Sequence, residues 1–209
     1  MTGGQTPRMR LPTAITGGIG SGKSRVASWL AAECELPLLA ADQEVRALLE
    51  PGEAGWQRLR WLGADFFDPD GKLRKARLRR AIFSDPGLKR QVESALHPLA
   101  LAALLAKMAS VPGRCLIEVP LLYEAGWQDY FVEVVAVVAP ETICLERIMR
   151  RDQVSEDEAQ AAIAAQMPIA DKAAQADKVI DNGGAWPDTV HQLQAIKKAW
   201  LLAGGTKKA

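Results

Sequence analysis

A glycine-rich stretch near the amino end of the chain constrains its fold more than any other feature. Residues 17–24 fit the pattern G-x-x-x-x-G-K-[ST], and they lie between a short apolar run and a helical pattern. Glycines let successive backbone N–H groups approach phosphate oxygens, and the positive end of the following helix faces the same anion. The alternative is a glycine-rich turn that binds nothing, but a coincidence of so many constrained positions argues against it. The stretch therefore predicts a nucleoside-triphosphate site made by Gly18, Ile19, Gly20, Ser21, Gly22, Lys23 and Ser24.

Two side chains of this stretch have predicted chemical roles. Lys23 is expected to reach the β- and γ-phosphates as a catalytic residue, and the Ser24 hydroxyl is expected to bind Mg²⁺. The predicted ligands are therefore a nucleoside triphosphate and Mg²⁺.

Composition narrows the class of protein. The chain has 209 residues, 48% of them hydrophobic, which suits one globular domain or one domain with an insertion. A formal net charge of +1 argues against a dedicated binder of nucleic acid or of a membrane surface. The longest apolar patch, residues 99–108, is too short to cross a bilayer, and three scattered cysteines favour a cytoplasmic protein. Residues 1–10 are expected to form a loose leader, with translation starting at Met1 or Met9.

The order of predicted elements indicates an α/β protein. Apolar and β-branched runs predict strands at residues 11–16, 36–41, 114–119, 132–139 and 179–181. Helical spacing predicts helices at residues 24–33, 42–50, 56–62, 73–83, 88–108, 140–151, 155–166 and 187–202, the fifth of them with a bend at Pro98. The alternation predicts an α/β fold with a central parallel five-stranded sheet, helices on both faces, an all-helical insertion and a helical lid. The core is expected at about residues 11–51, 112–145 and 176–205, the insertion at about 52–111 and the lid at about 146–175.

Two carboxylates follow predicted strands, at the sheet edge where ligands bind in such folds. Glu118 ends an apolar strand, a position typical of an acid that holds Mg²⁺ directly or through water. Asp42 is expected to accept the proton of the attacking hydroxyl as a catalytic residue. Helix capping is the alternative for each of them, and for Asp42 the two roles are compatible.

Basic residues form two groups. Arg147, Arg150 and Arg151, with Lys172 further on, predict a lid that neutralises charge on the transferring phosphoryl group, and a solvated helix face is the alternative. The second group lies in the helical insertion, where most members are expected at the surface and one or two are expected to meet an anionic substrate: Lys72, Arg74, Lys75, Arg77, Arg79 and Arg80. His97 is either a structural residue or a substrate ligand.

Taken together, these residues resemble the dephospho-coenzyme A kinase family. The resemblance extends from about residue 11 to residue 200 and rests on residues 16–24, 41–42, 97–98, 118–124, 147, 150–151, 166–168 and 176–183. It implies a three-layer P-loop NTPase fold with a central parallel five-stranded sheet, a helical substrate-binding insertion and a helical lid. The implied reaction is ATP-dependent phosphorylation of the ribose 3′-hydroxyl of dephospho-coenzyme A. The protein is expected to be a monomer or a weak homo-oligomer. The resemblance also implies ATP contacts from Arg147, a catalytic residue, and from Asn182 and Gly183 near the adenine. The substrate contacts that it implies are Asp42, Lys75, His97, Leu121 and Tyr123.

The chain departs from the family pattern at three places. Ala40 replaces the first acid of an Asp-Ala-Asp segment, Glu118 stands where Asp is usual, and Lys75 replaces an arginine. The longer Glu118 side chain favours a metal contact through water, and Lys75 lacks the bidentate fork of arginine. The alternatives are another P-loop small-molecule or nucleoside monophosphate kinase, and a non-catalytic coenzyme A-binding protein. A regulatory GTPase is excluded because Asn182 is the only asparagine and no Asn-Lys-x-Asp guanine reader exists.

Overall fold

The chain divides into two compact units. The computed structural model describes residues 11–205, so the leader and the alternative start at Met9 lie outside the described residues. One unit comprises the described parts of Met1–Leu39 and Val111–Ala209, and the other is Ala40–Ser110. The helical unit begins before the expected boundary near residue 52, because helix α2 (Ala41–Leu48) packs against α3 (Ala54–Arg58) and α5 (Pro86–Ser110).

A five-stranded sheet forms the centre of the first unit, with the order β2-β3-β1-β4-β5. Its strands are β1 (Leu11–Gly17), β2 (Leu38–Ala40), β3 (Arg114–Glu118), β4 (Glu133–Val138) and β5 (Lys178–Asp181). The pairs β1–β3, β1–β4 and β4–β5 are parallel. The predicted α/β class and the five predicted strands are confirmed, although β2 has only three residues.

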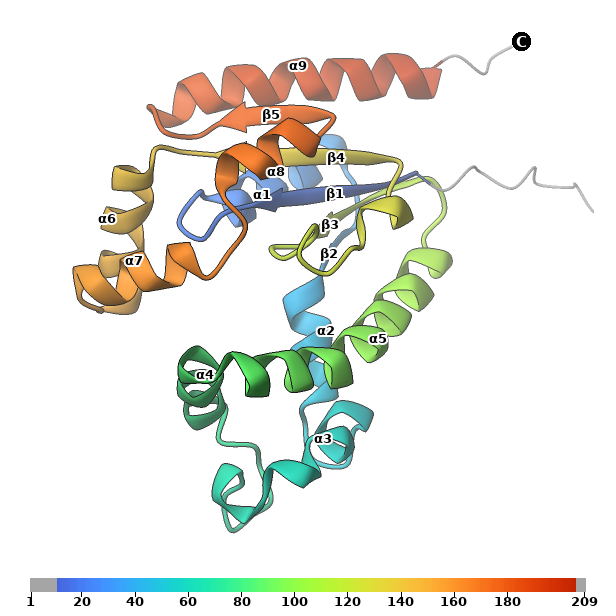
Figure 1. Cartoon of the computed structure of the whole chain (residues 1–209). Helices are drawn as coiled ribbons and strands as arrows, with labels where there is room; N and C mark the ends of the chain where they lie inside the picture. The colour runs from blue at the N-terminus through green and yellow to red at the C-terminus, as the bar shows by residue number, and fades with distance from the viewer. Residues whose placement is uncertain (1–10, 206–209) are drawn as a thin grey trace, which may run out of the picture. The chain divides into compact units, whose positions relative to one another are not determined.

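Helices cover both faces of this sheet. Figure 1 shows α8 (Ile169–Gln175) in front of the sheet and α1 (Lys23–Cys34) behind it, while α9 (Trp186–Gly205) lies along β5. Alternation along β1 explains the layers, because Ile15 joins the core beneath α1 and α9 whereas Ala14 faces the other way. That core consists of Ile15, Val26, Ala27, Leu30, Leu116, Val135, Val137, Ile180, Leu193, Ile196 and Trp200.

The helices between β4 and β5 differ in detail from the prediction. Pro140 is the N-cap of α6 (Glu141–Asp152) and not its first helical residue. The capping box of α7 (Glu156–Ala164) is confirmed, since the Ser155 side chain accepts from the Glu158 N–H and the Glu158 side chain accepts from the Ser155 N–H. Helix α8 was not predicted. Helix α8 packs on β1 and β4, so the last part of the expected lid segment lies against the sheet.

The second unit is helical, as predicted. After α2 and α3 come two 3₁₀ turns, η1 (Arg60–Leu62) and η2 (Ala64–Phe66), then α4 (Lys75–Ser84) and α5. A third 3₁₀ turn, η3 (Gln128–Tyr130), belongs to the first unit. The predicted helix at residues 56–62 is therefore α3 followed by a 3₁₀ turn. The apolar core of this unit contains Leu49, Leu59, Leu73, Leu78, Val92 and Leu96.

Helix α5 runs unbroken through Pro98, and Figure 1 shows its ribbon bend part-way along its length. Within residues 11–205 it is the one helix long and apolar enough to cross a membrane. The sequence had indicated only a shorter apolar patch at residues 99–108. Length and composition alone are weak evidence for a span, because core helices pass the same test. Two buried side chains of α5, Val92 and Leu96, pack in the core of the helical unit.

Candidate active site

The glycine-rich loop connects the carboxyl end of β1 to the amino end of α1, as predicted. Gly22 is the N-cap of α1, and Lys23 and Ser24 are its first two residues. Within the loop, the Ser21 N–H donates to the Gly18 carbonyl over 3.2 Å. This geometry presents loop amides and the positive end of a 12-residue helix to one point, which is the arrangement that binds phosphates.

Two loop glycines are required by both backbone and space. Gly20 has φ +79° and Gly22 has φ +85°, in the left-handed region that side chains disfavour. A Cβ on Gly20 would lie 2.6 Å from the Cys144 carbonyl oxygen, and a Cβ on Gly22 would lie 2.2 Å from Asn182 Nδ2. The loop therefore keeps its shape by packing against α6 and against the residue that follows β5.

Ser24 and Glu118 meet beside the loop. The Ser24 hydroxyl donates to Glu118 Oε1 over 2.6 Å, although the two residues are 94 positions apart in the chain. The sheet brings them together because Glu118 is paired in register with Ile15, at the end of the strand next to β1. A hydroxyl and a carboxylate aimed at one point supply the hard oxygen ligands that Mg²⁺ prefers, with water and phosphate completing its shell. These residues therefore fit the predicted metal ion.

Asn182 clamps the loop from the end of β5. Its side chain is 5% exposed, and Nδ2 donates to the Ser21 carbonyl over 2.7 Å. Its Oδ1 accepts from the Thr189 hydroxyl over 3.0 Å. Both ends of the carboxamide are thus engaged inside the protein, and the side chain supports the loop backbone. The backbone N–H of Gly183 donates to Asp181 Oδ1 over 2.8 Å, and the contact of both residues with adenine stays a prediction.

Arg147, on α6, donates hydrogen bonds to backbone carbonyls of the loop and of Asn182. Nη1 donates to Gly20 and Ser21 over 3.3 and 3.4 Å, and Nη2 donates to Asn182 over 2.9 Å. The guanidinium thus joins the loop to the end of β5, and its role toward phosphate stays a prediction. By contrast, Arg150 is exposed, and the exposed Arg151 pairs with Asp152 over 2.7 Å. The three arginines therefore do not act as one group in this structure.

The turn beside the loop, which contains Gln166 and Met167, is held by contacts on both sides. Gln166 Oε1 accepts from the Ile19 N–H over 2.9 Å. The next residue, Met167, donates its N–H to Glu124 Oε1 over 2.9 Å, and Lys172 Nζ lies 2.7 Å from the same oxygen. Lys172 is fully buried, so the alternative of a solvated face was wrong for this residue, and its predicted role in the lid stays a prediction. The sequence analysis did not predict a role for Gln166 or Glu124. The only signal for them was that both lie in segments that resemble the family, residues 166–168 and 118–124.

A cavity of about 430 Å³ lies beside this contact, within the first unit. It is lined by loop residues Gly18 and Ile19, by the turn that contains Gln166 and by mostly apolar side chains of α6, α7 and α8. Cys144 also lines it, and burial raises the pKa of this thiol, with Arg147 acting in the opposite direction. A raised pKa keeps the thiol protonated near neutral pH, so the cavity wall is uncharged at this point.

Asp42, Lys75 and His97 lie in the helical unit. Ala40, and not Asp42, is the N-cap of α2, so the capping alternative was wrong for Asp42. Asp42 is exposed in the first turn of this helix, where a negative charge is favourable. His97 is half-buried in α5.

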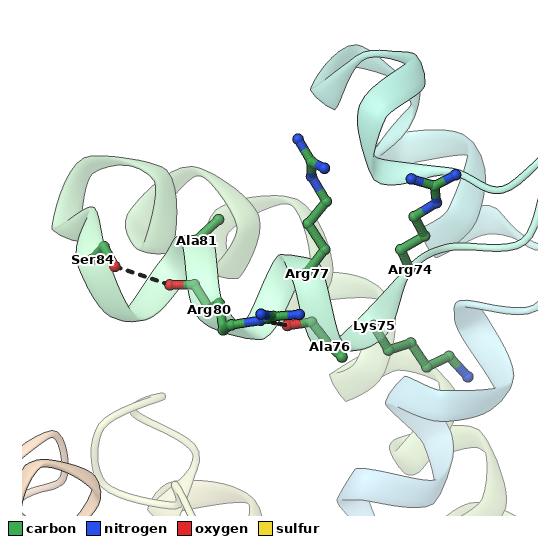
Figure 2. Close-up of a pocket in the computed structure, with 7 residues that line it drawn as sticks. All are labelled: Arg74, Lys75, Ala76, Arg77, Arg80, Ala81 and Ser84. Carbon is green, nitrogen blue, oxygen red and sulfur yellow. Dashed lines mark hydrogen bonds between the residues drawn. The ribbon is translucent and has the colours of Figure 1, made fainter. Parts of the chain in front are cut away.

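Helix α4 and its N-cap residue line an open hollow of about 700 Å³ with four basic side chains: Arg74, Lys75, Arg77 and Arg80. Lys75 pairs with Glu50 over 3.0 Å, and Arg77 pairs with Asp65 over 3.3 Å. Figure 2 shows Lys75 directed away from Arg74 and Arg77. These basic side chains are therefore partly neutralised by their own unit, and their contact with substrate stays a prediction.

Leu121 and Tyr123 follow Glu118 in the first unit. Leu121 is half-buried, whereas Tyr123 is 9% exposed. Burial raises the pKa of Tyr123, and the nearby Asp177 carboxylate raises it further. Asp177 accepts from the Val134 N–H at the amino ends of the strands, opposite the phosphate loop. The tyrosine hydroxyl is buried without a hydrogen-bond partner among the described residues, and its predicted substrate contact stays a prediction.

Comparison with known proteins agrees with this site. The model of the dephospho-CoA kinase family matches residues 11–188. A dephospho-CoA kinase of Geobacillus kaustophilus is 34% identical, with 92% of this chain and 98% of the relative covered. A dephospho-CoA kinase of Anaeromyxobacter dehalogenans is 39% identical, with 82% of this chain and 83% of the relative covered. A solved structure from Thermus thermophilus, 31% identical, superposes with a TM-score of 0.78 over 95% of this chain and 100% of its own. With its P-loop, its parallel sheet and these relatives, the chain belongs to the dephospho-CoA kinase family.

Proposed function

We propose that this chain transfers the γ-phosphoryl group of ATP to the ribose 3′-hydroxyl of dephospho-coenzyme A, giving coenzyme A and ADP. The observation that carries the proposal is the contact between Ser24 and Glu118 beside the glycine-rich loop, in a chain of this family. That contact joins the two elements that phosphoryl transfer needs from a P-loop kinase, a phosphate cradle and an acid at the tip of the next strand.

The loop and its neighbours account for binding of the triphosphate. Loop amides and the amino end of α1 face the phosphates, and Lys23 neutralises charge on the β- and γ-phosphates. Ser24 and Glu118 would hold Mg²⁺, which, when bound, offsets negative charge on the phosphate oxygens. Arg147 ties the loop to the end of β5, so its first contribution is to keep the cradle in shape.

Asp42 is the group that we assign to the acceptor hydroxyl. The P–O bond to the leaving ADP breaks as the bond to the 3′-oxygen forms, and the hydroxyl proton passes to the Asp42 carboxylate. Positioning and electrostatics carry most of the catalysis in phosphoryl transfer, so the main contribution of Asp42 is to position the hydroxyl. We assign the rest of the acceptor to Lys75, His97, Leu121 and Tyr123.

We also propose that the enzyme works in the cytoplasm, as a monomer or a weak homo-oligomer. All three cysteines of the chain are free, and two of them, Cys115 and Cys144, are buried. Free thiols suit a reducing compartment.

The test is ADP release measured with a panel of acceptors. Dephospho-coenzyme A should stimulate ADP release, whereas shikimate, gluconate and nucleoside monophosphates should leave the background rate unchanged. The proposal is wrong if dephospho-coenzyme A fails to stimulate release, or if another acceptor is clearly preferred.

A further inference from the structure

The side chain of Gln166 connects the turn between α7 and α8 to the phosphate loop. Gln166 Oε1 accepts from the Ile19 N–H over 2.9 Å, and this bond is partly buried. Ile19 lies in the middle of the loop, among the backbone amides that face phosphate in such loops. A side chain from outside the loop therefore occupies one edge of the predicted anion site.

A buried ion pair holds this turn in place. Lys172, which is fully buried, lies 2.7 Å from Glu124 Oε1 and donates to the Pro120 carbonyl over 2.8 Å. Glu124 in turn accepts from the Met167 N–H, the residue next to Gln166. A buried ammonium ion is costly to leave unpaired, so this arrangement resists separation. The turn is thus anchored to the segment after β3, and Gln166 projects toward the loop from a fixed base.

The chemistry of a carboxamide then sets what the rest of Gln166 offers. Because Oε1 accepts from Ile19, the other end of the group is Nε2, which carries two N–H donors. Gln166 also lines the 430 Å³ cavity together with Gly18 and Ile19 of the loop. Neutral N–H donors placed next to a phosphate cradle stabilise negative charge without adding a net charge of their own.

We propose that Gln166 is a phosphate-binding residue, with Oε1 fixing the Ile19 amide and Nε2 donating to a phosphate oxygen of bound ATP. The proposal rests on the proposed function in that it takes ATP as the ligand of the loop. The opposite behaviour would be a latch, in which Gln166 occupies the Ile19 amide only until a phosphate displaces it. The two differ in sign: loss of a binding residue weakens ATP binding, whereas loss of a latch strengthens it.

The test compares three variants of the full chain by calorimetric titration with Mg-ATP in the absence of any acceptor. Gln166→Ala should bind ATP about 10- to 100-fold more weakly, as expected for one hydrogen bond to a charged group. Gln166→Glu keeps an acceptor for Ile19 but replaces the N–H donors by a negative charge, so it should also bind weakly. Gln160→Ala, on α7 in the same cavity, is the matched control and should bind as the wild type does.

Hydrogen exchange of the Ile19 amide, followed by NMR, separates phosphate binding from loop support. Gln166→Glu should keep the Ile19 amide protected while it loses ATP affinity, so that the loss does not come from a loosened loop. Wild-type or tighter ATP binding by Gln166→Ala would overturn the proposal, and so would wild-type binding by Gln166→Glu. If Gln166→Ala does not fold, Gln166→Met, which is similar in size and lacks both the acceptor and the N–H donors, decides the question by the same sign. Because no acceptor is present, a wild type that binds ATP but fails the acceptor panel would contradict the proposed function and leave this inference standing.

Discussion

Replacing Asn182 by alanine should weaken the binding of every triphosphate, whether or not it carries an adenine. The wild-type carboxamide makes two buried hydrogen bonds, one to the Ser21 carbonyl and one from the Thr189 hydroxyl. Each is worth about 1 kcal/mol, and the cavity left by the side chain adds to the loss. The free energy of unfolding should therefore fall by about 2–4 kcal/mol, which lowers the melting temperature on the order of 10 °C.

The functional effect follows from where those bonds lie. Ser21 belongs to the phosphate loop, so loss of the clamp frees the loop backbone before it meets phosphate. Calorimetric titration with ATP and with inorganic tripolyphosphate should give similar losses of affinity. Each 1.4 kcal/mol of binding free energy spent on ordering the loop weakens binding about 10-fold. Thr189→Val is the matched control, because it removes the hydroxyl that donates to Oδ1 and keeps the bond to Ser21.

A different outcome would refute the clamp. If Asn182→Ala lost affinity for ATP but bound tripolyphosphate as the wild type does, Asn182 would act on the adenine and not on the loop. Unchanged thermal stability would contradict the hydrogen-bond argument in the same way.

Three further predictions address other parts of the site. Lys23→Ala and Asp42→Asn should each lose at least ~10²-fold in turnover, as expected for one positioned catalytic group, and near-normal ADP release by a folded variant would refute that residue's role. Gly20→Ala should lower the free energy of unfolding by more than 2 kcal/mol in a urea titration, because it adds a backbone clash to the positive φ angle. Gly52→Ala, with φ +91° and no atom within 4 Å of the added Cβ, should cost only about 1–2 kcal/mol, and an equal loss in both would contradict the clash. The Glu158 pKa is lowered by its backbone and side-chain bonds to Ser155, so this group stabilises the fold above its ordinary pKa and loses that effect as the pH falls through the lowered value. In Ser155→Ala an NMR titration should find the Glu158 pKa closer to its ordinary value, and an unchanged pKa would contradict the capping box.

Local signals explain why most of the fold could be predicted. The glycine pattern at residues 17–24, the β-branched run before Pro140 and the capping box at Ser155 each specify a structure within a few residues. The position of Glu118 also followed from a rule, because parallel strands bring their carboxyl ends to one edge. Its contact with Ser24 is the result of that rule.

Long-range burial explains what the sequence did not show. Helix α8 is short and rich in alanine and polar residues, and it packs on β1 and β4 while its fully buried Lys172 pairs with Glu124. A lysine in such a segment favours a surface assignment, and nothing nearby in the sequence indicates a partner 48 positions away. Asn182 is similar: its bond to Ser21 spans 161 positions, so a family segment identified the residue but not its contact.

The identity of the phosphorylated hydroxyl tests the central claim most directly. Phosphorus NMR of a reaction containing the enzyme, Mg-ATP and dephospho-coenzyme A should show one new phosphomonoester signal, coupled to the ribose H3′ proton and equal in amount to the ADP formed. A phosphate on any other hydroxyl, or ADP accompanied only by inorganic phosphate, would contradict the account.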